Sequence, residues 1–207
     1  LAIAGDTLGA IVKRVHHGET FDVVLGPRSA IDGFVKDGKA AAGSVTVVAS
    51  AGMGVAVRKG APKPDVSSPE ALKRTLLAAK SITYPDPKNL AGNPALGIHF
   101  NKVIDRLGIS DEMKSKTVFS SSLNIGELVA SGEAEVGIAQ LQNLNRSAGI
   151  EIVGPLPEDL QDPVVFAAAI MAGARDIEAS KALVHFLLRA PEATTAIRAQ
   201  RMDPAHP

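Results

Sequence analysis

The residues best suited to binding a ligand lie between Asp86 and Asn93, in a loop that leads into a helix. Asn93 is a favourable N-cap and Pro94 tolerates the first helical position, so the pattern predicts that a helix begins here. The first turn of a helix has backbone N–H groups without intrahelical partners and carries the positive end of the helix dipole, so it attracts anions. Asp86, Gly92 and Asn93 are therefore candidate ligand-binding residues for a negatively charged or strongly polar ligand.

A second loop-to-helix junction follows an expected strand over 117–120. Ser121 and Ser122 precede a predicted helix over 124–131, and their hydroxyl groups are candidate ligand contacts. Clusters of serine are also common in ordinary turns. The alternative is therefore that these residues only connect the strand to the helix.

A third candidate is the turn Gly5-Asp6-Thr7-Leu8-Gly9, which is predicted to join a strand to a helix. Its backbone N–H groups and the Thr7 hydroxyl suit an oxyanion. The carboxylate of Asp6 would repel an anion and would instead suit a ligand with a cationic or hydroxyl group. Asp6 is equally suited to capping the helix, so both interpretations stay open.

Signatures of catalysis and of metal binding are missing from the sequence. It has no G-x-S-x-G elbow and no Walker loop, and the stretch 52–55 lacks the third glycine of a dinucleotide site. His16 and His17 fall on different sides of a helix, while His99 and His185 stand alone, which suits no zinc site. We expect no enzymatic activity, no metal and no cofactor.

The composition excludes several ligand and partner classes. Lys and Arg total 22 and balance 22 Asp and Glu, so the chain has no basic footprint for nucleic acid. Only 3% of the residues are aromatic, which argues against stacked bases and sugars. Cysteine is absent, so disulfides and thiolate sites are excluded. No apolar run approaches the roughly 20 residues that cross a bilayer.

Short β-type runs alternate with helical periodicity, which predicts an α/β fold with a parallel or mixed sheet. The expected strands cover 1–4, 22–25, 45–49, 54–58, 81–84, 117–120, 135–139, 151–153 and 164–170. The expected helices follow Asp6, Ser68, Asn93 and Asn124, and cover 177–188 and 191–200. We expect two lobes, with lobe 1 formed by 1–79 plus 160–207 and lobe 2 by 80–159. The two crossings would then lie near Lys80 and at Gly154–Pro157.

Several longer stretches resemble the periplasmic solute-binding proteins of the molybdate-binding type. They are FDVVLGPRSAIDGFVKDGK, GVAVRKGAPKPDVSSPEALKRTLLAAKSITYPDP, GIHFNKVIDRLGI, ELVASGEAEVGIAQ and EIVGPLPEDLQ, and the similarity covers about residues 1–204. The resemblance implies the type 2 bilobal fold, in which two α/β lobes joined by two crossings close over a small ligand. It also implies delivery of that ligand to the membrane permease of an ABC importer.

The resemblance further implies the ligand class and some contacts. Relatives of this type bind varied oxyanions and organic anions, so we expect a small anionic solute in an interlobe cleft. The family uses the turn at Thr7 for ligand contacts, and Gln140 lies where the family approaches its ligand. The expected location is the periplasm, reached by export, with the signal peptide not present in this chain.

One departure from the family concerns the start of the chain. Members begin with an additional strand and helix before the segment that matches LAIAGDTLGA, so the first strand–helix unit is expected to be absent. We expect a homodimer that supplies the strand, or a rearranged lobe. The alternatives to a receptor are an enzyme or ligand-sensing module on the same lobes, with Asp6 and Asp86 as acid/base candidates, or a non-binding remnant.

Overall fold

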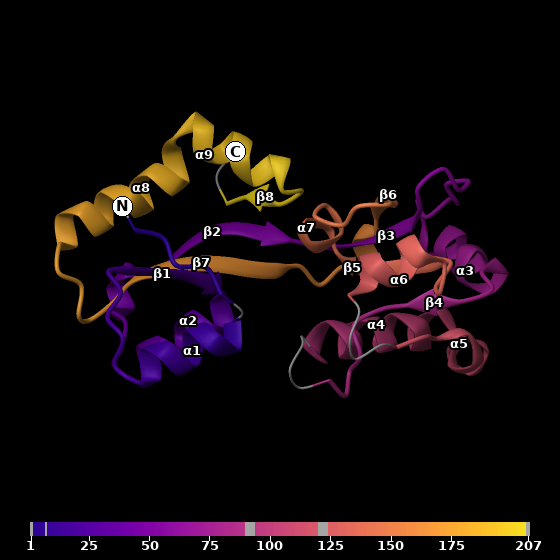
Figure 1. Cartoon of the computed structure of the whole chain (residues 1–207), viewed down its shortest axis with the longest axis horizontal. Coiled ribbons are helices and arrows are strands. Elements are labelled where there is room, and N and C mark those ends of the chain that lie inside the picture. The colour runs from indigo at the N-terminus through magenta and orange to yellow at the C-terminus, as the bar shows by residue number, and fades with distance from the viewer. Residues whose placement is uncertain (1, 7, 90–93, 120–123, 206–207) are drawn as a thin grey trace. The chain divides into compact units, whose positions relative to one another are not determined.

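The computed structural model describes residues 2–6, 8–89, 94–119 and 124–205, and it divides into two compact units (Figure 1). Unit 1 comprises Leu1–Ala51 and Val164–Pro207, and unit 2 comprises Gly52–Pro163. The sequence places the crossings near Lys80 and at Gly154–Pro157, whereas the structure places them at Ala51/Gly52 and at Pro163/Val164.

Unit 1 contains an antiparallel sheet of four strands in the order β1-β7-β2-β8. The strands are β1 (Val23–Pro27), β2 (Thr46–Ala51), β7 (Val164–Ile170) and β8 (Asp203–Pro204). The long strand β7 is central and pairs with β1 from Val23↔Ile170 to Pro27↔Phe166. β1 therefore forms one edge of the sheet.

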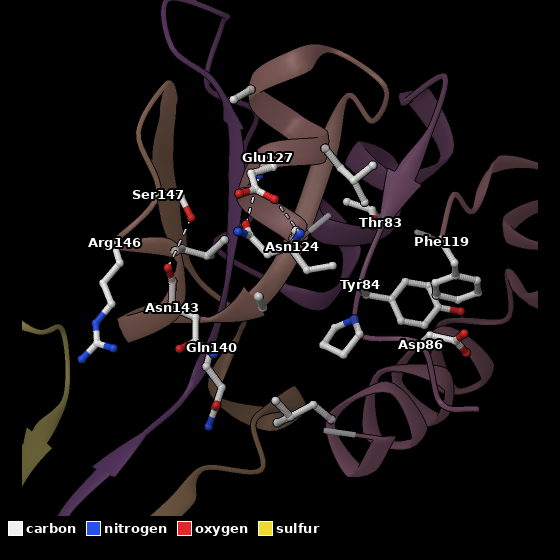
Figure 2. Close-up of a pocket in the computed structure, with 18 of the residues that line it drawn as sticks. Thr83, Tyr84, Asp86, Phe119, Asn124, Glu127, Gln140, Asn143, Arg146 and Ser147 are labelled. Atoms are coloured by element: carbon white, nitrogen blue, oxygen red, sulfur yellow. Dashed lines mark hydrogen bonds between the residues drawn. The ribbon is translucent and has the colours of Figure 1, made fainter. Parts of the chain in front are cut away.

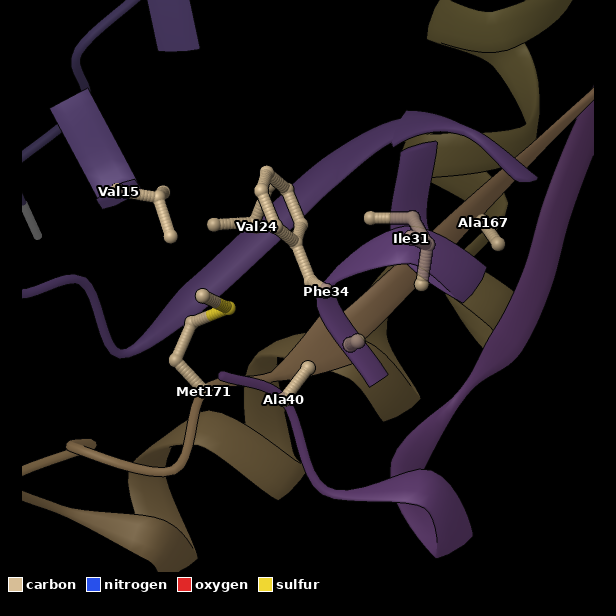
Figure 3. Packing of buried hydrophobic residues seen from close by; sticks show 8 residues of the cluster. Val15, Val24, Ile31, Phe34, Ala40, Ala167 and Met171 are labelled. Carbon is tan, nitrogen blue, oxygen red and sulfur yellow. The ribbon is translucent and has the colours of Figure 1, made fainter. Parts of the chain in front are cut away.

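Helices cover both faces of this sheet. They are α1 (Leu8–His16), α2 (Arg28–Lys36), α8 (Ile177–Arg189) and α9 (Pro191–Ala199), with a short 3₁₀ turn η1 (Ala42–Ser44). Successive β7 side chains point to opposite faces, so Ala167 and Ala169 join the core under α1 and α2, whereas Ala168 joins the core under α8. Figure 3 shows the first of these cores, in which Ile31 and Phe34 of α2 are buried.

Unit 2 contains a mixed sheet in the order β4-β5-β3-β6. The strands are β3 (Met53–Arg58), β4 (Ile82–Thr83), β5 (Val136–Gln140) and β6 (Ile150–Pro155). β3 is buried from Met53 to Val57 and pairs antiparallel with both β5 and β6. This pairing is why β3 and the following helix belong to unit 2, and why the first crossing comes before Met53. β4 and β5 are parallel.

The helices of unit 2 begin and end where the local sequence favours it. They are α3 (Pro69–Ala78), α4 (Pro94–Leu107), α5 (Ser110–Lys116), α6 (Ile125–Ser131) and α7 (Leu141–Leu144), with a 3₁₀ turn η2 (Glu158–Leu160). The Ser68 hydroxyl accepts the Ala71 N–H at 3.1 Å and caps α3, as the sequence predicts. Gly132 adopts φ 85° and ends α6, a conformation that glycine adopts without strain.

Two expected strands are wrong. Residues 2–4 form no strand, and Ile3 is 86% exposed. In the segment 117–120, Thr117 makes only an isolated bridge with Ile82, and residue 120 lies outside the described residues. Self-association stays a prediction. No helix in the described part of the chain is both long and apolar enough to cross a bilayer.

Candidate functional site

A pocket of about 630 Å³ lies within unit 2, beside the ends of β4 and β5 (Figure 2). Because these two strands run parallel, their carboxyl ends open at the same end of the sheet, which is where α/β sheets bind ligands. Thr83 at the end of β4 and Gln140 at the end of β5 both line the pocket. The other walls include the loop after β4, Leu96 of α4, Phe119, α6, and α7 with the turn after it.

Two buried polar atoms of these residues lack hydrogen-bond partners. Thr83 is 0% exposed and Gln140 is 5% exposed. The Thr83 Oγ1 and the Gln140 Nε2 find no partner among the residues that the structure describes. Buried polar groups are normally satisfied, so each of these atoms leaves a hydrogen-bonding position open to a water or to a ligand atom; Gln142 Oε1, outside the pocket lining, is a third such atom.

Tyr84 forms the aromatic part of the wall together with Phe119. The two ring centroids are 5.1 Å apart in an edge-to-face arrangement, and the Tyr84 hydroxyl donates to Asn101 Oδ1 at 2.8 Å. Burial is the main cause that raises the pKa of Tyr84 above its ordinary value, and the Asp86 carboxylate acts in the same direction. The Tyr84 hydroxyl is therefore protonated and a hydrogen-bond donor across the physiological range.

The start of α6 is capped by two of its own side chains, those of Asn124 and Glu127. The Asn124 side chain accepts the Glu127 N–H at 3.1 Å, and the Glu127 carboxylate accepts the Asn124 N–H at 3.0 Å. This reciprocal capping box occupies two of the amides that would otherwise be free for an anion. The Glu127 carboxylate, although it lines the pocket, is already engaged with the backbone.

The other charged residues of the pocket are Asp86 and Arg146. Asp86 Oδ1 accepts the Lys88 N–H at 2.8 Å, which shapes the loop after β4. Arg146 is exposed, and none of the ion pairs among the described residues includes it. Figure 2 shows Arg146 on the side of the pocket opposite Tyr84, Phe119 and Asp86.

A glycine of α4 sets the position of the loop after β4. A Cβ added at Gly97 would lie 2.0 Å from the Pro85 carbonyl oxygen and 2.7 Å from the Pro87 nitrogen. Both are backbone atoms, so only glycine lets α4 approach this loop so closely. Since Pro85 and Asp86 line the pocket, Gly97 fixes part of its wall.

The structure brings together two of the residues that the sequence singles out. Asp86 and Gln140 line the same pocket. Asp6 lies in unit 1, is exposed, and its Oδ2 is 3.9 Å from Arg14 Nη1 on α1. The remaining candidates lie outside the described residues: Thr7, Gly92, Asn93, Ser121 and Ser122.

Sequence reasoning missed Thr83 and Arg146. A hydroxyl residue at the end of an expected strand is a signal that could have found Thr83. Arg146 offers no such signal, because the short helix α7 and the turn after it bring this residue to the pocket. Among the described residues, no group of three or more His, Asp or Glu side chains is arranged to hold a metal ion.

Comparison with known sequences gives a family and two relatives. Residues 2–201 match the family described as bacterial extracellular solute-binding protein. The chain is 33% identical to an aconitate isomerase from Pseudomonas sp over 201 residues, which is 97% of this chain and 74% of the relative. It is 27% identical to the molybdate-binding protein ModA of Azotobacter vinelandii over 197 residues, covering 92% of this chain and 74% of that protein.

Solved structures share the fold at low sequence identity. The substrate binding domain assigned to a molybdenum ABC transporter from Clostridium difficile matches with a TM-score of 0.78 at 15% identity, over 96% of this chain and 83% of that one. The periplasmic molybdate-binding protein of Azotobacter vinelandii matches with a TM-score of 0.65 at 19% identity, over 94% and 83%. These likenesses confirm the expected bilobal α/β fold class. The match over residues 2–201 shows that the chain belongs to the bacterial extracellular solute-binding protein family.

Proposed function

We propose that the chain is the solute receptor of an ABC-type importer and that the unit 2 pocket holds part of a small anionic solute. The observation that carries this proposal is a pair of polar atoms without partners among the described residues, Thr83 Oγ1 and Gln140 Nε2, at the carboxyl ends of β4 and β5. Arg146 at the side of the pocket adds a positive charge that no described carboxylate neutralises. These features favour an anion held by hydrogen bonds and one guanidinium group.

In this proposal Asp6 and Thr7 of unit 1 stay candidate ligand contacts, as the family resemblance implies. A solute that binds one conformation of the receptor more tightly than another shifts the population toward that conformation. The receptor would work outside the cytoplasm, in the periplasm, and would deliver its solute to a membrane permease. Membership of an extracellular solute-binding family supports this location and this partner.

Thermal unfolding of the whole chain with a panel of small anions tests the proposal. The panel contains molybdate, sulfate, phosphate and small carboxylates. A ligand present at 100 times its Kd stabilises the folded state by about 2.7 kcal/mol, which raises the Tm by several degrees. We expect at least one anion to do so. An unchanged Tm with every member of the panel would contradict the proposal.

A matched pair of variants locates the effect. Ala148 lines the pocket and is exposed, so Ala148→Trp fills the pocket without entering the core. Ala196 is exposed on α9 in unit 1, and Ala196→Trp serves as the control. Ligand stabilisation is expected to disappear in the first variant and to persist in the second.

An isomerase of a small organic acid is the second candidate function. It is favoured by the 33% identity to an aconitate isomerase over 97% of this chain. An isomerase that moves a proton needs a base within hydrogen-bond reach of its substrate. Asp86 is the acidic residue of the pocket best placed for that role, because the Glu127 carboxylate already caps α6.

Proton NMR of the protein with cis-aconitate or trans-aconitate tests the isomerase directly. Conversion of one isomer into the other that Asp86→Asn abolishes would support the enzyme. Binding without conversion would support the receptor. The receptor is the function that we favour, because the matched family and the structural neighbours consist of solute-binding proteins.

A further inference from the structure

We propose that the unit 2 pocket selects an organic acid with an uncharged hydroxyl or carbonyl oxygen in preference to a tetrahedral oxyanion. This inference rests on the proposed receptor function and names the class of its solute. It assigns two roles to three residues: Thr83 and Gln140 bind the uncharged oxygen, and Arg146 binds a carboxylate.

The volume and the wall of the pocket favour a ligand with a carbon skeleton. The cavity measures about 630 Å³, within the range of about 300–1,000 Å³ that is typical of sites for organic ligands. A bare oxyanion is far smaller and has no apolar surface to bury. The apolar part of the lining includes Leu96, Phe119, Ile125, Ala139 and Leu144. Methylene or methine groups of an organic acid would contact these side chains.

The two orphan polar atoms define the uncharged group of the ligand. The Gln140 Nε2 carries only hydrogen-bond donors, so its partner must be an acceptor. The Thr83 hydroxyl both donates and accepts, so it pairs with the same kind of oxygen. Neither residue carries a charge, and Arg146 is the cation among the described lining residues, so a second carboxylate at Thr83 and Gln140 would be buried without a counter-charge, whereas a hydroxyl or carbonyl oxygen needs none.

The charged residues of the pocket place the carboxylate of the ligand near Arg146. Asp86 and Glu127 each accept a backbone N–H, from Lys88 and from Asn124 respectively. Arg146 has no ion pair within the described part of the chain, and its guanidinium can bind a carboxylate through two N–H groups. Arg146 lies on the side of the pocket away from Tyr84 and Phe119 (Figure 2). The carboxylate of the ligand would contact Arg146, and its carbon skeleton would contact the apolar side of the pocket.

Calorimetric titration of the whole chain with matched acids tests the inference. Malate and succinate differ by one hydroxyl group, and so do citrate and tricarballylate. We expect the hydroxylated member of at least one pair to bind about ten times more tightly than its partner. We also expect molybdate and sulfate to bind more weakly than that hydroxy acid.

Variants then connect the preference to the named residues. Thr83→Val keeps the shape of the side chain and removes the hydroxyl, so it should remove most of the preference for the hydroxy acid. Gln140→Met should also reduce the preference for the hydroxy acid. Arg146→Gln should lower the affinity for every carboxylate in the panel by about ten-fold. Lys114→Gln, on α5 and outside the pocket lining, is the control and should change no affinity.

The outcomes separate this inference from the proposed function. If an oxyanion binds more tightly than every organic acid, the receptor function stands and the inference is overturned. Equal affinities within both pairs of acids would also overturn it. If no anion binds at all, the receptor proposal itself fails.

Discussion

The side chain of Gln161 pairs with the backbone of Met53 as a neighbouring strand would. The Met53 N–H donates to Gln161 Oε1 at 3.0 Å, and Gln161 Nε2 donates to the Met53 carbonyl at 2.8 Å and to the Leu156 carbonyl at 3.2 Å. Met53 is the first residue of β3, and Gln161 lies just before Pro163, the last residue of unit 2. The side-chain amide of Gln161 therefore links the two ends of unit 2 through hydrogen bonds.

Replacing Gln161 with alanine is expected to lower the free energy of unfolding by about 1–3 kcal/mol, because the buried Met53 N–H loses its partner. Gln161→Glu keeps an acceptor for that N–H but places a carboxylate oxygen against the Met53 and Leu156 carbonyl oxygens, so its loss should be at least as large. Urea denaturation measures both values. Equal stability of Gln161→Ala and the unmodified protein would show that the pairing contributes nothing.

Gly97 and Gly33 both lie in helices, but replacing each with alanine should change stability in opposite directions. Gly97→Ala should destabilise unit 2 and weaken ligand binding, because its Cβ would lie 2.0 Å from the Pro85 carbonyl oxygen. Gly33 lies in α2 with no heavy atom within 4 Å of an added Cβ, so Gly33→Ala should stabilise the protein by up to about 1 kcal/mol. Thermal unfolding would distinguish them, and a stabilising Gly97→Ala would contradict the close packing of α4 on the loop after β4.

The chain's single tyrosine, Tyr84, offers a direct measurement of pKa. Burial raises the pKa of Tyr84, so its ultraviolet titration should have a midpoint above 10.0. The folded state then keeps the phenolic proton after the unfolded chain has lost it. The resulting contribution to stability is complete below pH 10.0 and is lost as the pH rises through the folded-state pKa. A midpoint at or below 10.0 would contradict the burial of this side chain, and Tyr84→Phe should flatten the alkaline loss of stability.

The unpartnered atoms of the pocket predict an unusual effect on stability. Thr83→Val and Gln140→Met remove Thr83 Oγ1 and Gln140 Nε2, buried atoms that make no hydrogen bond to the described part of the chain, so the free energy of unfolding should stay unchanged or rise by about 1 kcal/mol. Ser180 is the matched control, because its buried hydroxyl donates to the Asp176 carbonyl at 2.7 Å. Ser180→Ala should therefore lose about 1 kcal/mol. A loss of similar size in Thr83→Val would mean that its hydroxyl has a partner in the folded protein.

Much of the fold follows from local sequence patterns. The run Val164–Ile170 is apolar, ends near the turn at 172–174, and is β7 in the structure. Ser68 and Pro69 at the start of α3, and Gly132 at the end of α6, are capping signals that the structure confirms. These elements are predictable because the determining interactions lie within a few residues.

The rest depends on contacts between distant segments. The helix α2 is an exception, because its local signals are present although it is not among the expected helices: Gly26-Pro27 precedes it, and Ile31, Phe34 and Val35 have the i, i+3, i+4 spacing of a helix. The boundary of unit 2 lies before Met53 because β3 pairs with β5, and this pairing joins residues about 80 positions apart, which no local pattern reveals. Asp86 could be proposed from its own loop and Gln140 from the family resemblance. Arg146 could not be proposed, because only the folded chain brings it to the pocket.

Hydrogen–deuterium exchange of the whole chain, with and without saturating molybdate, malate or citrate, locates the ligand on the molecule. If the unit 2 pocket holds the solute, a bound anion slows exchange in peptides covering 83–89 and 140–148. Peptides from α9 should be unaffected. Binding of an anion that leaves both pocket segments unprotected would contradict the assignment of this pocket as the solute site.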